Sequence, residues 1–249
     1  MTFGVSHNKY FIRMKRQPLF FQLALMALFA LVFVSCQDSG PYEETTQTYS
    51  VSGFDRLDMG SAFRITVRPG TTFAVEARGN RSDVNDLVVA VRNGTLTAQY
   101  DNYRRNRHHD MYITITMPTL RGINFSGASR STISGFPNVN SMDVTLSGAS
   151  KSDVAVSTTR LTTAISGAST LTLNGSSSGL TGDVSGASKL NAYDLLTETA
   201  DLEVSGASNV QIRVKDALNV SASGASKVRY RGTPRLNSKV SGASSVEQE

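Results

Sequence analysis

Cysteine is nearly absent from this chain of 249 residues, in which Cys36 is the only one. A single thiol allows no intramolecular disulfide and no zinc or iron–sulfur site built from several cysteines. Histidine is almost as rare, with three residues, and tryptophan is missing. The sequence also lacks a glycine-rich phosphate-binding motif. We therefore expect no metal site, no cofactor and no enzymatic activity.

Proline is scarce as well, with 6 residues against 20 glycines and an apolar content of 39%. This composition is too poor in proline for collagen and too apolar for a disordered chain. The formal net charge of +5 is unevenly spread, because four basic residues and no acidic residue precede Ser35. From Cys36 onward, 21 basic side chains face 20 acidic ones. The charge balance therefore gives no reason to expect a nucleic-acid partner.

An apolar segment lies near the N-terminus, where Leu19 to Val34 is interrupted only by Gln22. Its length suits the apolar part of a signal peptide better than a membrane-spanning helix, which needs about 20 residues. The string Phe33-Val34-Ser35-Cys36 resembles a bacterial lipobox in which Phe33 replaces the usual leucine. We predict a lipoprotein signal peptide over residues 1–35, lipidation of Cys36 and membrane attachment through that lipid. The alternatives are a buried free cysteine or an uncleaved helix.

Two segments separate the signal peptide from the second half of the chain. Residues 36–49 are polar, which predicts a tether. Residues 50–117 form short alternating segments separated by turn signals such as Asn93-Gly94, which predict strands. These strands could form irregular first coils of a larger stack, or a separate sheet that caps the end of such a stack.

The tetrapeptide Ser-Gly-Ala-Ser recurs seven times in the second half, at steps of 18 to 21 residues. Repeats of near-constant length are typical of proteins built from stacked structural units. Apolar residues alternate with polar ones after each copy, as in Val210, Ile212 and Val214, and this period indicates strands. We predict an all-β fold over residues 118–246, a parallel β-helix or β-solenoid with coils of about 19 residues and two or three short strands in each.

Each residue of the tetrapeptide has an expected structural role. The glycine suits a bend that a Cβ atom disfavours, and the small alanine suits a tight inner corner. The serines can bind backbone groups or the equivalent serine one coil away. A role as nucleophiles is disfavoured, because seven copies lack an adjacent base. The expected turn glycines are Gly127, Gly148, Gly167, Gly186, Gly206, Gly224 and Gly242.

Several further motifs resemble one family of bacterial envelope proteins. They are Val51-Ser-Gly-Phe54-Asp55, Asn93-Gly94-Thr95-Leu96, Met117-Pro118-Thr119-Leu120 and Tyr230-Arg-Gly232-Thr-Pro234, together with the repeated tetrapeptide. Over residues 50–246 the sequence is similar to the family of the putative auto-transporter adhesin, head GIN domain. The resemblance implies a right-handed β-helix-like solenoid, frequent lipidation and no catalytic residues to transfer.

An arginine cluster is the first candidate binding site. Arg104, Arg105 and Arg107 fall within four positions, between two strand-like segments. Guanidinium groups suit sulfate, phosphate or carboxylate groups on glycans. The alternative is a solvated loop tip. A metal site at His108 and His109 is disfavoured, because neighbouring residues of a strand point to opposite faces.

The position directly after each tetrapeptide is the second candidate. It carries Lys151, Lys189 and Lys227 in every second coil. Regular stacking would place these lysines about 9.6 Å apart, at twice the strand spacing. They could form a basic stripe for an anionic polysaccharide, or serve solubility alone. The segment Gly175-Ser176-Ser177-Ser178-Gly179 fits the letters of a serine-hydrolase elbow but lacks its context, so we interpret it as a flexible turn.

These observations favour a lipid-anchored surface module for adhesion, with a polysaccharide or protein ligand. The alternatives are a structural or sensory envelope protein and, less favoured, a glycan-acting enzyme on a β-helix scaffold. Such an enzyme needs paired carboxylates, and the aspartates of the repeats fall at differing phases. We expect the cell envelope as location, at the outer membrane, on its periplasmic face or the cell surface.

Overall fold

The computed structural model describes residues 41–107 and 109–249. Residues 41–249 form one compact unit, which is the subject of all that follows. The predicted signal peptide, residues 1–35, and the lipidation site Cys36 lie outside the described residues. Among those described, no helix has the length and apolar character needed to cross a membrane.

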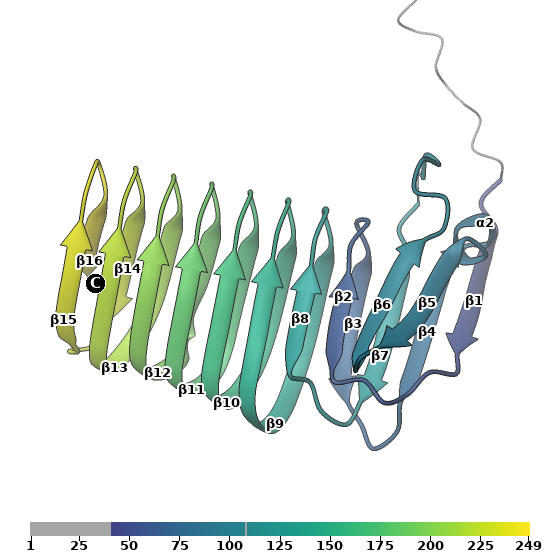
Figure 1. Ribbon diagram of the computed structural model, residues 1–249, viewed down its shortest axis with the longest axis horizontal. Coiled ribbons are helices and arrows are strands. Elements are labelled where there is room, and N and C mark those ends of the chain that lie inside the picture. Colours follow the sequence, from purple (N-terminus) through teal and green to yellow (C-terminus); the bar gives the residue numbers. More distant parts are fainter. Residues whose placement is uncertain (1–40, 108) are drawn as a thin grey trace, which may run out of the picture. The chain divides into compact units, whose positions relative to one another are not determined.

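The unit is built almost entirely from strands, and all of its 16 strands belong to one hydrogen-bonded sheet (Figure 1). Its described helix is the single turn α2 (Arg81–Val84). The strands of the N-terminal part are β1 (Glu44–Tyr49), β2 (Arg56–Met59), β3 (Arg64–Pro69), β4 (Ala74–Asn80), β5 (Leu87–Arg92), β6 (Thr95–Tyr100) and β7 (Tyr112–Met117). The strands of the repeat region are β8 (Gly122–Phe125), β9 (Arg130–Leu146), β10 (Lys151–Ile165), β11 (Thr170–Val184), β12 (Lys189–Val204), β13 (Asn209–Ala222), β14 (Lys227–Arg231), β15 (Arg235–Val240) and β16 (Ser245–Gln248).

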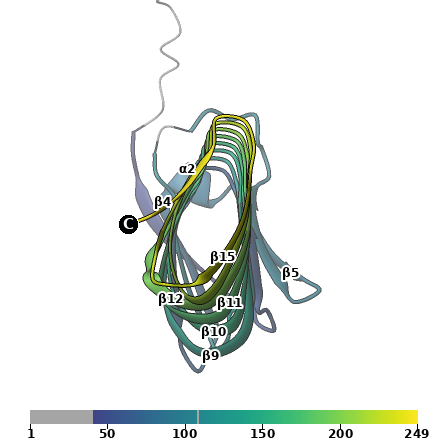
Figure 2. The same cartoon turned by 90° about the vertical axis from the view of Figure 1, so that its left-hand side faces the viewer.

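Parallel pairing between consecutive coils confirms the predicted β-solenoid. β9, β10, β11, β12 and β13 pair with one another in sequence order, and Figure 2 shows these coils overlying one another along the stack. The prediction of two or three short strands per coil is confirmed for the coil of β14 and β15 and is wrong for the coils from β9 to β13. Each of these coils is one continuous strand of 14 to 17 residues that bends near its middle. Register shifts between Thr172 and Asn174 and between Ala192 and Leu196 lie at this bend.

Each tetrapeptide forms a narrow loop at the end of a strand, and in Figure 1 these loops form a row beyond the arrowheads. All seven turn glycines have φ between 70° and 77°, a region that L-residues rarely adopt. The backbone ladder continues through the turns, since the alanine N–H of each coil donates to the glycine carbonyl of the coil before it. In one such bond the N–H of Ala187 lies 2.8 Å from the oxygen of Gly167.

The alanine side chains of the turn point in the direction opposite to the one predicted. The alanines, such as Ala149 and Ala187, are exposed, so their expected place at an inner corner is wrong. The last serine of the tetrapeptide points inward instead, and Ser150 is 1% exposed. Its hydroxyl donates to the carbonyl oxygen of Ser147 at 2.8 Å. This bond lets a small polar side chain occupy the corner, because a buried hydroxyl needs a partner.

The N-terminal part combines coil-like and antiparallel strands. β2 pairs in parallel with β8, and β3 pairs in parallel with β9, so both belong to the stack. β1 and β4 are antiparallel to each other, and β5 is antiparallel to β6. The predicted tether over residues 36–49 is wrong for its last six residues. They form β1, in which threonines favour the extended backbone and Tyr49 packs against the core.

One continuous hydrophobic core runs inside the stack. The inward positions of neighbouring coils are register partners, as Val154 and Leu173 show. Both side chains are completely buried. Alternation within each strand then directs the intervening polar residues outward, so every coil presents the same outward positions in a row.

Candidate functional site

The predicted arginine cluster lies in the loop between β6 and β7, where two of its members are engaged within the protein. Arg107 pairs with Asp86 and lies 3.6 Å from Asp83, and its side chain is only 11% exposed. Arg105 lies 3.8 Å from the same Asp83, whose side chain is 5% exposed. These contacts attach the loop to α2 and the residues after it. Arg105 and Arg107 therefore act first as structural partners of buried carboxylates.

The third arginine of the loop is placed differently. Arg104 is exposed and its Nε donates to the hydroxyl of Tyr103 at 3.2 Å. Among the carboxylates of the described residues, none lies within ion-pair distance of Arg104. The geometry thus does not bring the three arginines together as one anion site.

Tyr100 lies beneath this loop. The guanidinium carbon of Arg107 is 3.6 Å from the centre of its ring, and Phe63 contacts it edge-on. Burial raises the pKa of Tyr100 to about 12, with a further contribution from the charge of Asp83. The tyrosine is thus neutral at physiological pH and serves as a packing partner.

The position after each tetrapeptide forms one straight row, which we call the basic column. Lys151 is the register partner of Arg130 and Thr170, and Lys189 is the partner of Thr170 and Asn209. Successive lysines are two strand spacings apart, which is about 9.6 Å. The full column is Arg130, Lys151, Thr170, Lys189, Asn209, Lys227 and Ser245.

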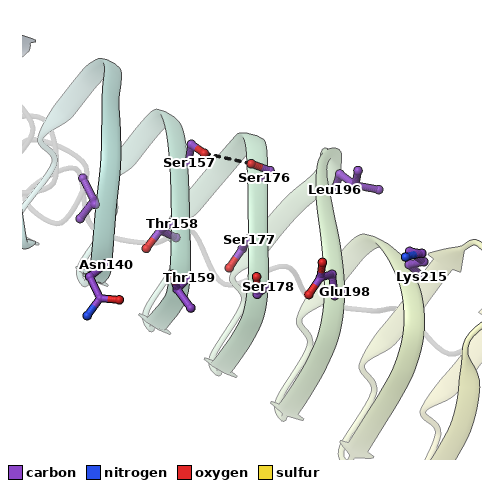
Figure 3. A pocket seen from close by; sticks show the side chains of 11 residues that line it. Asn140, Ser157, Thr158, Thr159, Ser176, Ser177, Ser178, Leu196, Glu198 and Lys215 are labelled. Carbon is purple, nitrogen blue, oxygen red and sulfur yellow. Dashed lines mark hydrogen bonds between the residues drawn. The ribbon is translucent and has the colours of Figure 1, made fainter.

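A hollow lies at the bend of the coils, and we call it the corner groove. Its volume is about 520 Å³, within the usual range of small-molecule sites. It crosses β9 to β13, and Figure 3 shows its side chains on successive coils. Its polar side chains are Asn140, Ser157, Thr159, Ser176, Ser178, Glu198 and Lys215, and the exposed Leu196 flanks it.

Short side chains create this groove. Ser157 and Ser176 are register partners whose hydroxyls lie 3.1 Å apart. Deeper in the groove, Ser177 donates to the carbonyl of Gly179 at 2.8 Å, and Thr158 donates to the carbonyl of Arg160 at 3.1 Å. These inner hydroxyls are occupied by the backbone. The outer hydroxyls, with the carboxylate of Glu198, face solvent and are available to a ligand.

The segment Gly175 to Gly179 is part of this groove, and its interpretation as a flexible turn is wrong. Its residues lie within β11 and pair with both β10 and β12. Sequence reasoning missed the groove because register shifts give Asn140 and Glu198 other distances from the tetrapeptide than the residues beside them on β10 and β11 have. One signal was present in the unusual run of three serines, which leaves space where neighbouring coils carry larger residues.

The described residues contain no group of three or more histidine, cysteine, aspartate or glutamate side chains arranged to hold a metal ion. His109 packs against the ring of Tyr42, and Asp110 pairs with Arg64 at 3.1 Å. These two residues therefore have structural contacts of their own. The other member of that segment, His108, is not described.

A comparison with protein families matches residues 53–234 to the family described as putative auto-transporter adhesin, head GIN domain. The chain belongs to this family. The match takes in β2 to β14, which are most of the N-terminal strands and most of the repeat region, so both belong to one family domain. The family is described as adhesins and not as enzymes. A search of curated proteins found no significant match.

Solved structures of similar fold are themselves described as putative adhesins or as a putative lipid binding protein. A putative adhesin of Bacteroides fragilis is 21% identical, with a TM-score of 0.78 over 83% of this chain and 97% of that one. A putative adhesin of Parabacteroides merdae is 15% identical, with a TM-score of 0.66 over 83% and 96%. A putative lipid binding protein of Parabacteroides distasonis is 16% identical, with a TM-score of 0.65 over 83% and 96%. At these identities the likeness establishes the fold alone.

Proposed function

We propose that this member of the family is a lipid-anchored adhesion module of the bacterial cell envelope that binds glycans in the corner groove. The observation that carries the proposal is the groove itself, an open hollow of about 520 Å³ lined by hydroxyl, amide and carboxylate groups. Hydroxyl side chains both donate and accept hydrogen bonds, as the hydroxyls of a sugar require.

The rigidity of the stack supports this assignment. The outer hydroxyls of Ser157 and Ser176 stand on paired strands, so their spacing is set by the backbone ladder at about 4.8 Å. A binding surface that is already ordered loses little conformational entropy when a ligand binds. The apolar side chain of Leu196, 48% exposed, can contact the carbon face of a sugar ring beside the polar groups.

A pair of substitutions in β11 tests the groove. Ser178→Tyr places a large side chain in the groove, whereas Thr181→Tyr makes the same kind of change at an exposed position of the same strand outside it. Both positions face solvent, so both variants should fold. On a glycan array, the wild-type chain should bind a defined set of neutral glycans, Ser178→Tyr should lose them and Thr181→Tyr should keep them.

A second pair tests the carboxylate. Glu198→Gln should weaken glycan binding about tenfold, since a charged hydrogen bond is replaced by a neutral one. Glu203→Gln, also exposed on β12 but outside the groove, should change nothing. Binding of neutral glycans that survives both Ser178→Tyr and Glu198→Gln would contradict the groove assignment. Glycan binding by none of the proteins would favour a purely structural envelope role.

The anchoring part of the proposal depends on Cys36. Replacement by serine removes the thiol that would carry the lipid, and the protein should then leave the membrane fraction for the soluble fraction of the envelope. Metabolic labelling with a fatty acid should mark the wild-type chain and not Cys36→Ser. Equal labelling of both chains would contradict lipidation at this residue, and protease treatment of intact cells would decide between the cell surface and the periplasmic face.

A further inference from the structure

A second hollow lies on the basic column, far along the coil from the corner groove. It has a volume of about 250 Å³ and is lined by Lys189, Asn209, Gln211, Lys227 and Arg229, together with Val210 of the strand between the lysines. We call it the basic pocket. Three cations and two amides around one hollow form a set of hydrogen-bond donors suited to an anion.

The stacking explains why a hollow forms here. Asn209 is the register partner of Lys189 on one side and of Lys227 on the other. A short side chain between two long ones leaves a gap whose walls are the two lysines. Gln211 and Arg229, which are also register partners, close the pocket along the strands.

The charges of the pocket are only partly balanced. Lys227 lies 3.3 Å from Glu247, and Arg229 lies 3.4 Å from Glu249. The described residues place no carboxylate within ion-pair distance of Lys189. These ion pairs are exposed at the surface, where such pairs are weak and a ligand anion can replace them.

We propose that the basic column binds an acidic polysaccharide whose charged and neutral sugars alternate, with one carboxylate or sulfate group held in the basic pocket. From Lys151 onward the column alternates, because Lys151, Lys189 and Lys227 are separated by the neutral Thr170 and Asn209. At the other end of the column Arg130 stands directly beside Lys151. The interval of about 9.6 Å between lysines is close to the length of an extended disaccharide. This charged site rests on the proposed glycan adhesion and adds a second class of glycan to it.

Other anionic partners fit this arrangement less well. A nucleic-acid strand carries one phosphate per about 3.4 Å, which is denser than one lysine in every second coil. A lipid surface is two-dimensional and is best met by clustered cations, whereas the column is a single row. The alternation of cationic and neutral hydrogen-bonding residues therefore favours a polysaccharide.

Binding of hyaluronan fragments, an alternating acidic polymer, tests the inference, with uncharged dextran, single-stranded DNA and phosphatidylglycerol vesicles as comparison probes. The protein used is the chain from Pro41 onward, which is one compact unit with its own core. Hyaluronan should bind with an affinity that falls as salt rises, and dextran should not bind to the column. The double variant Lys189→Ala with Lys227→Ala should bind hyaluronan about a hundredfold more weakly, at roughly tenfold for each ammonium group removed.

A matched double variant controls for net charge. Arg160→Ala with Lys239→Ala removes two exposed cations from other rows of the stack and should keep hyaluronan binding unchanged. Glu247→Gln removes a carboxylate that competes for Lys227 and should increase hyaluronan affinity a few-fold, a gain that loss of folding cannot produce. Equal weakening in both double variants, or tighter binding of DNA or vesicles than of hyaluronan, would overturn the inference.

Ser178→Tyr should leave hyaluronan binding intact, so a failure of the groove proposal remains distinguishable from a failure of this one.

Discussion

Replacing one turn glycine by alanine should separate two coils of the stack, and Gly186 is the best position for this test because it lies near the middle of the repeats. Its φ is 76°, and a Cβ atom added there would lie 2.5 Å from the carbonyl oxygen of Gly167 and 3.1 Å from its nitrogen. Real Cβ atoms do not approach backbone so closely, so the two coils must move apart. The bond from the N–H of Ala187 to that same carbonyl, 2.8 Å long, would stretch or break.

The size of the effect follows from two costs. A left-handed conformation costs an L-residue about 1–2 kcal/mol, and forcing extra atoms into a packed region costs about 1–3 kcal/mol more. Gly186→Ala should therefore lower the free energy of unfolding by about 2–5 kcal/mol. Gly53 provides the control, since its φ is 74° and an added Cβ would meet nothing within 4 Å. Gly53→Ala should cost only the first amount, about 1–2 kcal/mol.

Urea denaturation of both variants, followed by circular dichroism, measures the difference directly. A larger loss of stability for Gly186→Ala than for Gly53→Ala supports the conclusion that the close approach of neighbouring coils, and not backbone conformation alone, requires glycine in the turns. Equal losses of stability in the two variants would refute this reasoning. A change in the slope of the unfolding free energy against urea concentration would show that the compactness of one state has changed or that the transition is no longer two-state, and probes in each half of the stack would then distinguish the two cases.

The loop and the buried tyrosine give two further predictions. Arg107→Ala should destabilise the protein by about 3–5 kcal/mol, because it removes the mostly buried partner of both Asp83 and Asp86 and leaves Asp83 only the more exposed Arg105. Arg104→Ala should be neutral. Thermal unfolding measures both variants, and similar melting temperatures would contradict the assigned pairing. Tyr100 should ionise near pH 12 in an ultraviolet titration. The folded pKa of Tyr100 lies above the unfolded value of 10.0, so its contribution to stability is complete below pH 10 and is lost as the pH rises toward 12. A titration in which every tyrosine ionises near pH 10 would contradict the burial of Tyr100. So would a titration curve that is the same in Tyr100→Phe as in the wild type.

The repeat made the fold predictable from the amino-acid sequence. Seven tetrapeptides at near-constant spacing indicate stacked units, and alternation after each copy indicates strands. The orientation of the turn was less predictable, because alanine is more apolar than serine and composition alone places it inside. The structure reverses this order, since the carbonyl of Ser147 offers the buried hydroxyl of Ser150 a hydrogen-bond partner three residues away. Such a local bond leaves no trace in hydrophobic periodicity.

The candidate sites also differ in how far the sequence alone could predict them. The basic column depends on one position of the repeat, so its lysines could be aligned by counting residues. The corner groove depends in part on register shifts, as at Thr172, so that counting residues from the tetrapeptide aligns Ser157 with Ser176 but not Ser176 with Leu196. The pairing of Arg107 with Asp83 joins residues 24 positions apart that belong to no repeat. This contact therefore has no periodic signal in the sequence.

A glycan array probed with three proteins tests the central claim, glycan adhesion by a rigid solenoid, most directly. The proteins are the wild-type chain from Pro41 onward, Ser178→Tyr, and the double variant of Lys189 and Lys227 to alanine. We predict that the groove variant loses the neutral glycans that the wild type binds and keeps the acidic ones, while the lysine variant shows the opposite pattern. An array on which the wild type binds no glycan, or on which both variants retain every signal, would contradict that claim.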